Sequence, residues 1–191
     1  MPEEGVQSMC HTDILRIEEI AHVVRVFSNL GIKSVRLTGG EPLVRKGVVD
    51  LVRDINDMPG IKNISLTTNG VLLPRMADQL RQAGLSRVNI SLDTLDAEQF
   101  HAITRRGYLQ EALDGIDAAL AAGFDPVKIN AVAVRQLHQD YLAFAKLSID
   151  RPLHVRFIEY MPVGESSGAN GCGWRPDDVI SCEELFEIIN R

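Results

Sequence analysis

Closely spaced cysteines are missing from this sequence. Its three cysteines are Cys10, Cys172 and Cys182, and no two of them have the short spacing of a zinc or iron–sulfur motif. An odd cysteine number argues against a disulfide framework and indicates a reducing compartment. We therefore assign no metal ligand and no catalytic cysteine within the 191 residues.

Long apolar runs and an excess of positive charge are missing as well. No run approaches the roughly 18 apolar residues of a membrane-spanning helix. Residues 1–5 lack the basic and apolar parts of an export signal, so we expect a cytoplasmic protein. A formal net charge of −6 argues against binding to a nucleic acid polymer.

Strand-like and helix-like segments alternate along the chain. Strands are expected over 33–38, 61–67, 87–93, 126–134 and 153–159. Helices are expected over 17–30, 47–56, 74–83, 109–122 and 137–147, with two more beginning near 96 and 182. This alternation predicts a parallel α/β sheet with right-handed crossovers, either as a barrel or as an open doubly wound sheet.

The expected strands belong to one unit, residues 1–160. The stretch 161–176 is rich in glycine and serine and predicts a mobile loop. We therefore expect 161–191 to comprise this loop and the start of a C-terminal region.

Polar residues without an evident packing role follow or end each expected strand. Each has an ordinary explanation, such as a tight turn, a helix cap, an Arg156–Glu159 ion pair or a packed methionine. Ligands of parallel α/β folds bind at the carboxyl ends of the strands. Five such ends together predict a large polar ligand. The residues are Gly39 to Pro42, Thr67 to Gly70, Ser91 and Asp93, Lys128 and Asn130, and Arg156, Glu159 and Met161.

The pair Gly39-Gly40 is suited to a close approach between backbone and ligand. Glycine has no Cβ, so its amide and carbonyl can reach a bound molecule. Neighbouring carbonyls and the Glu41 carboxylate could accept hydrogen bonds from the ammonium of an amino-acid moiety. Three cations would serve a second, anionic ligand such as a nucleotide phosphate. They are Arg36, Lys128 and Arg156.

Five blocks of the sequence, in order, resemble the GTP 3′,8-cyclases, a family of radical S-adenosylmethionine (SAM) enzymes of molybdenum cofactor biosynthesis. They are VRLTGGEPL at 35–43, LTTNG at 66–70, NISLD at 89–93, VKIN at 127–130 and RFIEYM at 156–161. The resemblance implies a partial, TIM-like (β/α) barrel of six strands. Of these the chain would carry five, without the first strand and the C-terminal cluster region, and 33–38 would become an open edge.

The resemblance also implies which residues contact the ligands. Gly40, Ser91 and Met161 match positions that contact SAM, and Glu41 lies in the same motif. Arg36, Thr67 and Lys128 match positions that contact GTP.

The implied reaction converts GTP to (8S)-3′,8-cyclo-7,8-dihydroguanosine 5′-triphosphate, with SAM cleaved at a [4Fe-4S] cluster. The family holds that cluster with Cys-x3-Cys-x2-Cys and a second cluster with another three cysteines. Neither set matches the cysteines of this chain, so we expect the chain alone to be inactive. The resemblance further implies a homodimer and a next enzyme of the molybdopterin pathway that acts on the product.

Two alternatives stay open on the residues alone. One is a non-catalytic domain that retains a nucleotide site, and the other is a different radical SAM enzyme, such as a peptide maturase. The GTP-type positions Arg36, Thr67 and Lys128 favour the cyclase over the peptide maturase.

Overall fold

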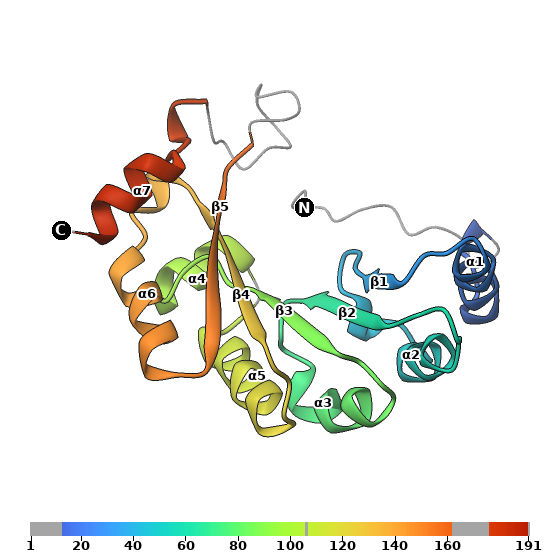
Figure 1. Ribbon diagram of the computed structural model, residues 1–191. Coiled ribbons are helices and arrows are strands. Elements are labelled where there is room, and N and C mark those ends of the chain that lie inside the picture. The colour runs from blue at the N-terminus through green and yellow to red at the C-terminus, as the bar shows by residue number, and fades with distance from the viewer. Residues whose placement is uncertain (1–12, 106, 162–175, 191) are drawn as a thin grey trace.

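Five parallel strands form a single sheet with the order β1-β2-β3-β4-β5 (Figure 1). The computed structural model describes residues 13–105, 107–161 and 176–190. The strands are β1 (Ser34–Leu37), β2 (Asn63–Thr68), β3 (Arg87–Ser91), β4 (Val127–Ala133) and β5 (Leu153–Glu159). Because the order never reverses, the sheet has no switch point of a doubly wound fold. The barrel-type alternative is therefore confirmed.

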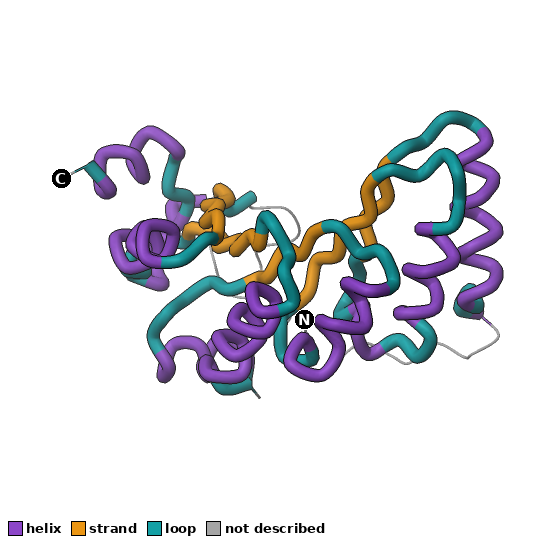
Figure 2. The backbone as a smooth tube through the Cα atoms, turned by 60° about the horizontal axis from the view of Figure 1, so that its bottom comes forward, coloured by secondary structure: helices purple, strands orange, loops and turns teal. Residues whose placement is uncertain are grey.

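Helices connect the strands and lie along the outside of the sheet (Figures 1 and 2). They are α1 (Ile17–Asn29), α2 (Val48–Asn56), α3 (Leu73–Gln82), α4 (Ala97–Thr104), α5 (Leu109–Ala121), α6 (Tyr141–Asp150) and α7 (Cys182–Ile189). Short 3-10 turns accompany them within the described residues: η2 (Pro42–Val44), η3 (Arg135–Leu137) and η4 (Pro176–Asp178). No helix in the described part of the chain is long and apolar enough to cross a membrane.

The helix expected over 137–147 is wrong at its start. Residues Arg135–Leu137 form the turn η3, and His138 ends it with a left-handed φ of 45°. The helix α6 begins only at Tyr141, because the Asp140 side chain accepts a hydrogen bond from the Ala143 amide at 2.9 Å and caps it. The apolar spacing that predicted the earlier start cannot distinguish a 3-10 turn from the first turn of an α-helix.

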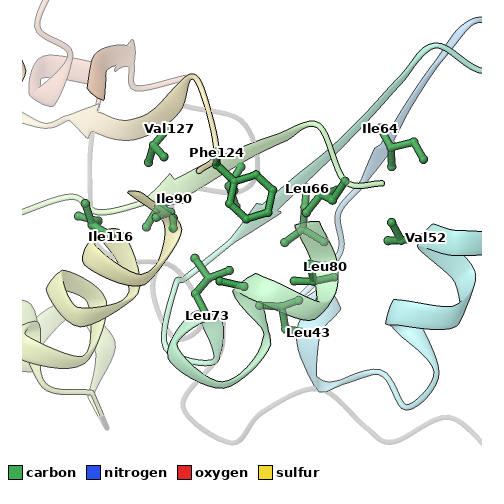
Figure 3. Close-up of a cluster of buried hydrophobic side chains, with 14 of the residues drawn as sticks. Leu43, Val52, Ile64, Leu66, Leu73, Leu80, Ile90, Ile116, Phe124 and Val127 are labelled. Atoms are coloured by element: carbon green, nitrogen blue, oxygen red, sulfur yellow. The ribbon is translucent and has the colours of Figure 1, made fainter. Parts of the chain in front are cut away.

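The core lies between the sheet and the helices that cover one of its faces. Successive strand residues point to opposite faces, and every second one enters this core. Leu66, Ile90 and Ile129 are 0% exposed, and they come from three neighbouring strands. Figure 3 shows Leu66 and Ile90 among side chains from α2, α3 and α5. Burial of this apolar surface is the main term that holds the sheet to its helices.

Segment 176–190 packs on the far end of the sheet around a second, smaller core. Ala133, Tyr141, Ile180 and Leu185 form this cluster. Arg135 links it further, because its guanidinium donates to both carboxylate oxygens of Glu184 at 2.6 and 2.7 Å. At the opposite end, β1 pairs only with β2, so the predicted open edge is confirmed for the described residues.

Candidate functional site

The face of the sheet opposite the helices carries polar residues in two rows. In the first row, the register places Thr67 beside Asn89, Asn89 beside Lys128, and Lys128 beside His154. In the second row, Ser91 lies beside Asn130 and Asn130 beside Arg156. Neighbouring strands are about 4.8 Å apart. The predicted residues of four strands therefore meet on one surface.

Three cations on this surface lack internal partners. Arg36 and Arg156 are exposed and Lys128 is half-buried, and within the described residues none of them makes an ion pair or a side-chain hydrogen bond. Four other arginines among the described residues form ion pairs, as Arg135 does with Glu184, whereas Arg87, which shares this face, does not. A face with three unneutralised positive charges attracts an anion, and guanidinium and ammonium groups suit phosphate oxygens.

Asn130 carries a buried oxygen without a partner. Within the described ranges its Oδ1 atom is inaccessible to solvent and accepts no hydrogen bond. Asn89 of the first row, by contrast, is buried but donates from Nδ2 to the Leu66 carbonyl at 3.1 Å. Unpaired buried acceptors are uncommon because they cost free energy. The orphaned oxygen fits a site that a donor group of a ligand completes.

The glycines that follow β1 are not explained by packing. A Cβ atom added to Gly39 or Gly40 would meet no atom of the described residues within 4 Å. At Gly115, by contrast, an added Cβ would collide with the Gly70 carbonyl, so packing alone requires glycine there. Gly39 and Gly40 line a cleft of about 660 Å³ together with Arg36 and with Ile17 of α1. The open space beside the pair fits a bound molecule that touches the backbone.

Glu41 joins the ends of the first two strands. Its Oε1 atom accepts hydrogen bonds from the Leu43 amide at 3.0 Å and from the Thr68 hydroxyl at 2.8 Å. Its Oε2 atom accepts one from the Asn69 amide at 2.7 Å. Thr68 in turn accepts a bond from the Gly70 amide at 3.1 Å. The carboxylate that was expected to hold an ammonium thus has three donors within the chain.

Other predicted residues fall at the same rim. Ser91 is exposed at the end of β3, and Met161 is 69% exposed two residues beyond β5. The alternative of an Arg156–Glu159 ion pair is wrong, because the two alternate to opposite faces and Glu159 accepts from the Cys182 amide at 2.7 Å. The loop expected over 161–176 lies almost entirely outside the described residues.

Asp93 has a different role from the helix cap that was one explanation for it. The cap of α4 is Asp96, which accepts from the Gln99 amide at 2.7 Å. Asp93 instead accepts from the Val132 amide at 2.9 Å and so ties the end of β3 to β4. Burial raises the pKa of this carboxyl above its ordinary 3.8, and the hydrogen bond from Val132 only partly opposes the rise.

Sequence reasoning misses two members of the polar rows, Asn89 and His154. Asn89 lies between Thr67 and Lys128, and His154 extends the row onto β5. Period-two alternation with the core residues Val88 and Val155 is the signal that could have found them. Without the strand register, however, their place beside Lys128 is not visible.

The described residues do not fit an iron–sulfur cluster. Of the three cysteines only Cys182 lies among them, exposed and free. No group of three His, Cys, Asp or Glu side chains in the described ranges could hold a metal ion. Cys10 and Cys172 lie outside these ranges.

A comparison with family models matches residues 7–147 to the radical SAM superfamily. The chain belongs to this superfamily. Its relatives include the GTP 3′,8-cyclases of Pelotomaculum thermopropionicum, 52% identical over 191 residues, and of Petrotoga mobilis, 51% identical over 190 residues. These matches cover 100% and 99% of this chain but 57% of each relative. The chain thus spans little more than half the length of these radical SAM relatives.

Solved structures of other proteins share the fold. HydG, a maturase of the [FeFe]-hydrogenase, has a TM-score of 0.66 at 16% identity over 92% of this chain and 42% of its own. The enzyme anSMEcpe, solved with bound AdoMet and a peptide, has a TM-score of 0.65 at 19% identity over 92% and 51%. The structural similarity supports the partial barrel, but identities this low say nothing about the substrate of this chain.

Proposed function

We propose that this chain is the central part of a GTP 3′,8-cyclase, which binds SAM and GTP on the polar face of its sheet. The intact enzyme would convert GTP to (8S)-3′,8-cyclo-7,8-dihydroguanosine 5′-triphosphate for molybdenum cofactor biosynthesis. The observation that carries the proposal is the set of three unpaired cations on one face of a sheet whose first strand ends in an open glycine turn. The relatives named GTP 3′,8-cyclase point to GTP, and the radical SAM family model points to SAM.

SAM would lie at the rim formed by the ends of β1, β3 and β5. The backbone of Gly40 would face its methionyl part, since nothing in the described part of the chain occupies the space beside this residue. Ser91 offers an exposed hydroxyl, and Met161 offers an apolar, polarisable side chain. Glu41 belongs to the same segment.

GTP would lie across the first polar row. Arg36 and Lys128 would neutralise its phosphates, and the Thr67 hydroxyl between them would orient the molecule by a hydrogen bond. Arg156, in the second row, adds a third positive charge. These groups bind and position the substrate, whereas the radical chemistry belongs to the cofactor and to cysteines outside this site.

The wider assignments rest on the same proposal. Residues 1–160 would be the partial barrel, and 161–191 would lead into the C-terminal part of the enzyme. A cytoplasmic location, a homodimer and transfer of the product to the next molybdopterin enzyme would follow from the cyclase assignment.

Titration of the 191-residue chain with GTP in a calorimeter tests the substrate assignment. We expect Lys128→Ala to weaken GTP binding by about tenfold, because one charge-assisted contact is worth about 1.5 kcal/mol or more. Lys62→Ala is the matched control, since Lys62 is an exposed lysine just before β2, at the opposite end of the strands. Equal affinities of the two variants would remove the argument for GTP.

Titrations of the chain with GTP and with SAM separate the two other functions. GTP binding without SAM binding would favour a non-catalytic nucleotide-binding domain. SAM binding without GTP binding would favour another radical SAM enzyme, such as a peptide maturase. Binding of both ligands supports the cyclase.

A further inference from the structure

We infer that Glu41 is a positioning residue that fastens the glycine turn of β1 to the end of β2. In this role it sets Thr67 relative to Gly39-Gly40 and does not itself contact SAM. The inference deepens the proposed function, on which the names of the two ligands rest. The contacts that carry it are internal to the chain.

The Glu41 carboxylate is largely occupied by internal donors. An ionised carboxylate has about four acceptor sites on its two oxygens. Three are taken, by the Leu43 amide, the Thr68 hydroxyl and the Asn69 amide. Two of the donors lie 27 and 28 residues away along the chain, so their bonds are tertiary contacts between two strand ends.

The carboxylate is held from the helix-covered side of β2, although Glu41 also lines the cleft beside Gly39 and Gly40. Thr68 is 3% exposed and alternates to the helix-covered face, together with Leu66. Its hydroxyl reaches Glu41 from that face, whereas Thr67 points to the polar face. Glu41 therefore contacts the end of β2 on the face opposite to the one to which Thr67 points.

The contacts extend from Glu41 into the turn after β2. Thr68 donates to Glu41 and accepts from the Gly70 amide, so a single hydroxyl links the carboxylate to the turn. The Asn69 side chain tightens the same turn by accepting from the Val71 amide at 3.0 Å. Thr67 immediately precedes these residues. A loss of the Glu41 contacts should therefore loosen the strand end that holds the GTP-side residue.

Three variants test this arrangement. Glu41→Gln retains the shape but replaces one acceptor oxygen with an amide donor. Thr68→Val retains the volume but removes the linking hydroxyl, and Thr68→Ser is its matched control because it retains that hydroxyl. Amide hydrogen exchange, measured by NMR on the ligand-free 191-residue chain, reports directly on the strand end.

We expect the Asn69 amide to exchange at least about tenfold faster in Glu41→Gln, in line with the loss of a charge-assisted bond. Thr68→Val should accelerate exchange at Gly70, and Thr68→Ser should stay near wild type. The core amide of Ile90 should not change. Unchanged exchange at Asn69, or equal acceleration at Ile90, would overturn the inference, because the effect would then be absent or merely global.

Ligand titration provides the second measurement. As a positioning residue, Glu41 should affect the binding of both ligands. We expect Glu41→Gln to weaken the binding of GTP and of SAM, and Thr68→Val to do the same from the covered face. The double variant should bind no more weakly than the weaker-binding single variant. A loss confined to SAM would show that Glu41 is a direct contact. If the wild-type chain binds neither ligand, the proposed function fails in this chain, while the exchange rates still decide the role of Glu41.

Discussion

The two faces of the sheet differ in how far the chain itself explains their residues. On the helix-covered face, Leu66 and Ile90 are fully buried among other apolar groups. One residue further along β2, Thr67 points to the other face, beside Asn89 and in the same row as Lys128. Packing accounts for the first face. On the second face the cations have no partner among the described residues, and under the proposed function they meet the ligands.

The sharpest test of this contrast uses adjacent residues of β2. We expect Leu66→Ala to lower the free energy of unfolding by about 2–5 kcal/mol, because it leaves a cavity in the core. Thr67→Ala should cost less than about 1 kcal/mol, because the side chain is only half-buried. Urea denaturation followed by circular dichroism measures both. Comparable losses would show that the polar face also supports the fold.

Two glycines provide a second test of the same contrast. Gly115→Ala should cost about 1–3 kcal/mol, since its Cβ would press against the backbone of Gly70. Gly40→Ala should change stability by less than about 0.5 kcal/mol, because its Cβ meets nothing and Gly40 is not among the glycines with positive φ. Its effect should instead fall on SAM affinity. Destabilisation by Gly40→Ala would place that glycine with the packing residues.

The smallest expected effect concerns Asp93 and the pH dependence of the free energy of unfolding. Its pKa is raised by burial, so between the ordinary value of 3.8 and the raised one the folded chain holds a proton that the unfolded chain has released. The free energy of unfolding should therefore fall as pH rises through that window. Asp93→Asn can still accept from the Val132 amide but cannot ionise.

Urea midpoints of wild type and Asp93→Asn, compared from about pH 4 to pH 7, measure this contribution. The difference between the two chains isolates Asp93 from the other carboxylates. We expect wild type to lose stability relative to the variant as pH rises. A constant difference would show that the Asp93 carboxyl is solvated in the folded chain, like an exposed residue of the polar face.

Much of the fold could be predicted from the spacing of apolar residues and from the glycines and prolines that end each element. All five expected strands are confirmed within two residues at each end, because alternating apolar residues and flanking glycines mark them. The start of α6 could not be predicted, since the cap at Asp140 competes with an apolar spacing that fits an earlier start. The strand-end residues of the site were also predictable, because parallel strands bring their carboxyl ends to one edge.

Local sequence determined the strands, most of the helices and the polar residues at the strand ends, because these depend on propensity and on near neighbours. Only the tertiary structure decided which of those residues are bonded within the fold and which are left open for the proposed ligands. Asp93 and Glu41 both carry carboxylates at the rim, yet their oxygens accept hydrogen bonds from Val132 and from the end of β2. Arg36, Lys128 and Arg156 remain without such partners among the described residues. The physical reason is that hydrogen-bond partners 27 to 39 residues apart are set by strand register, which no local pattern encodes.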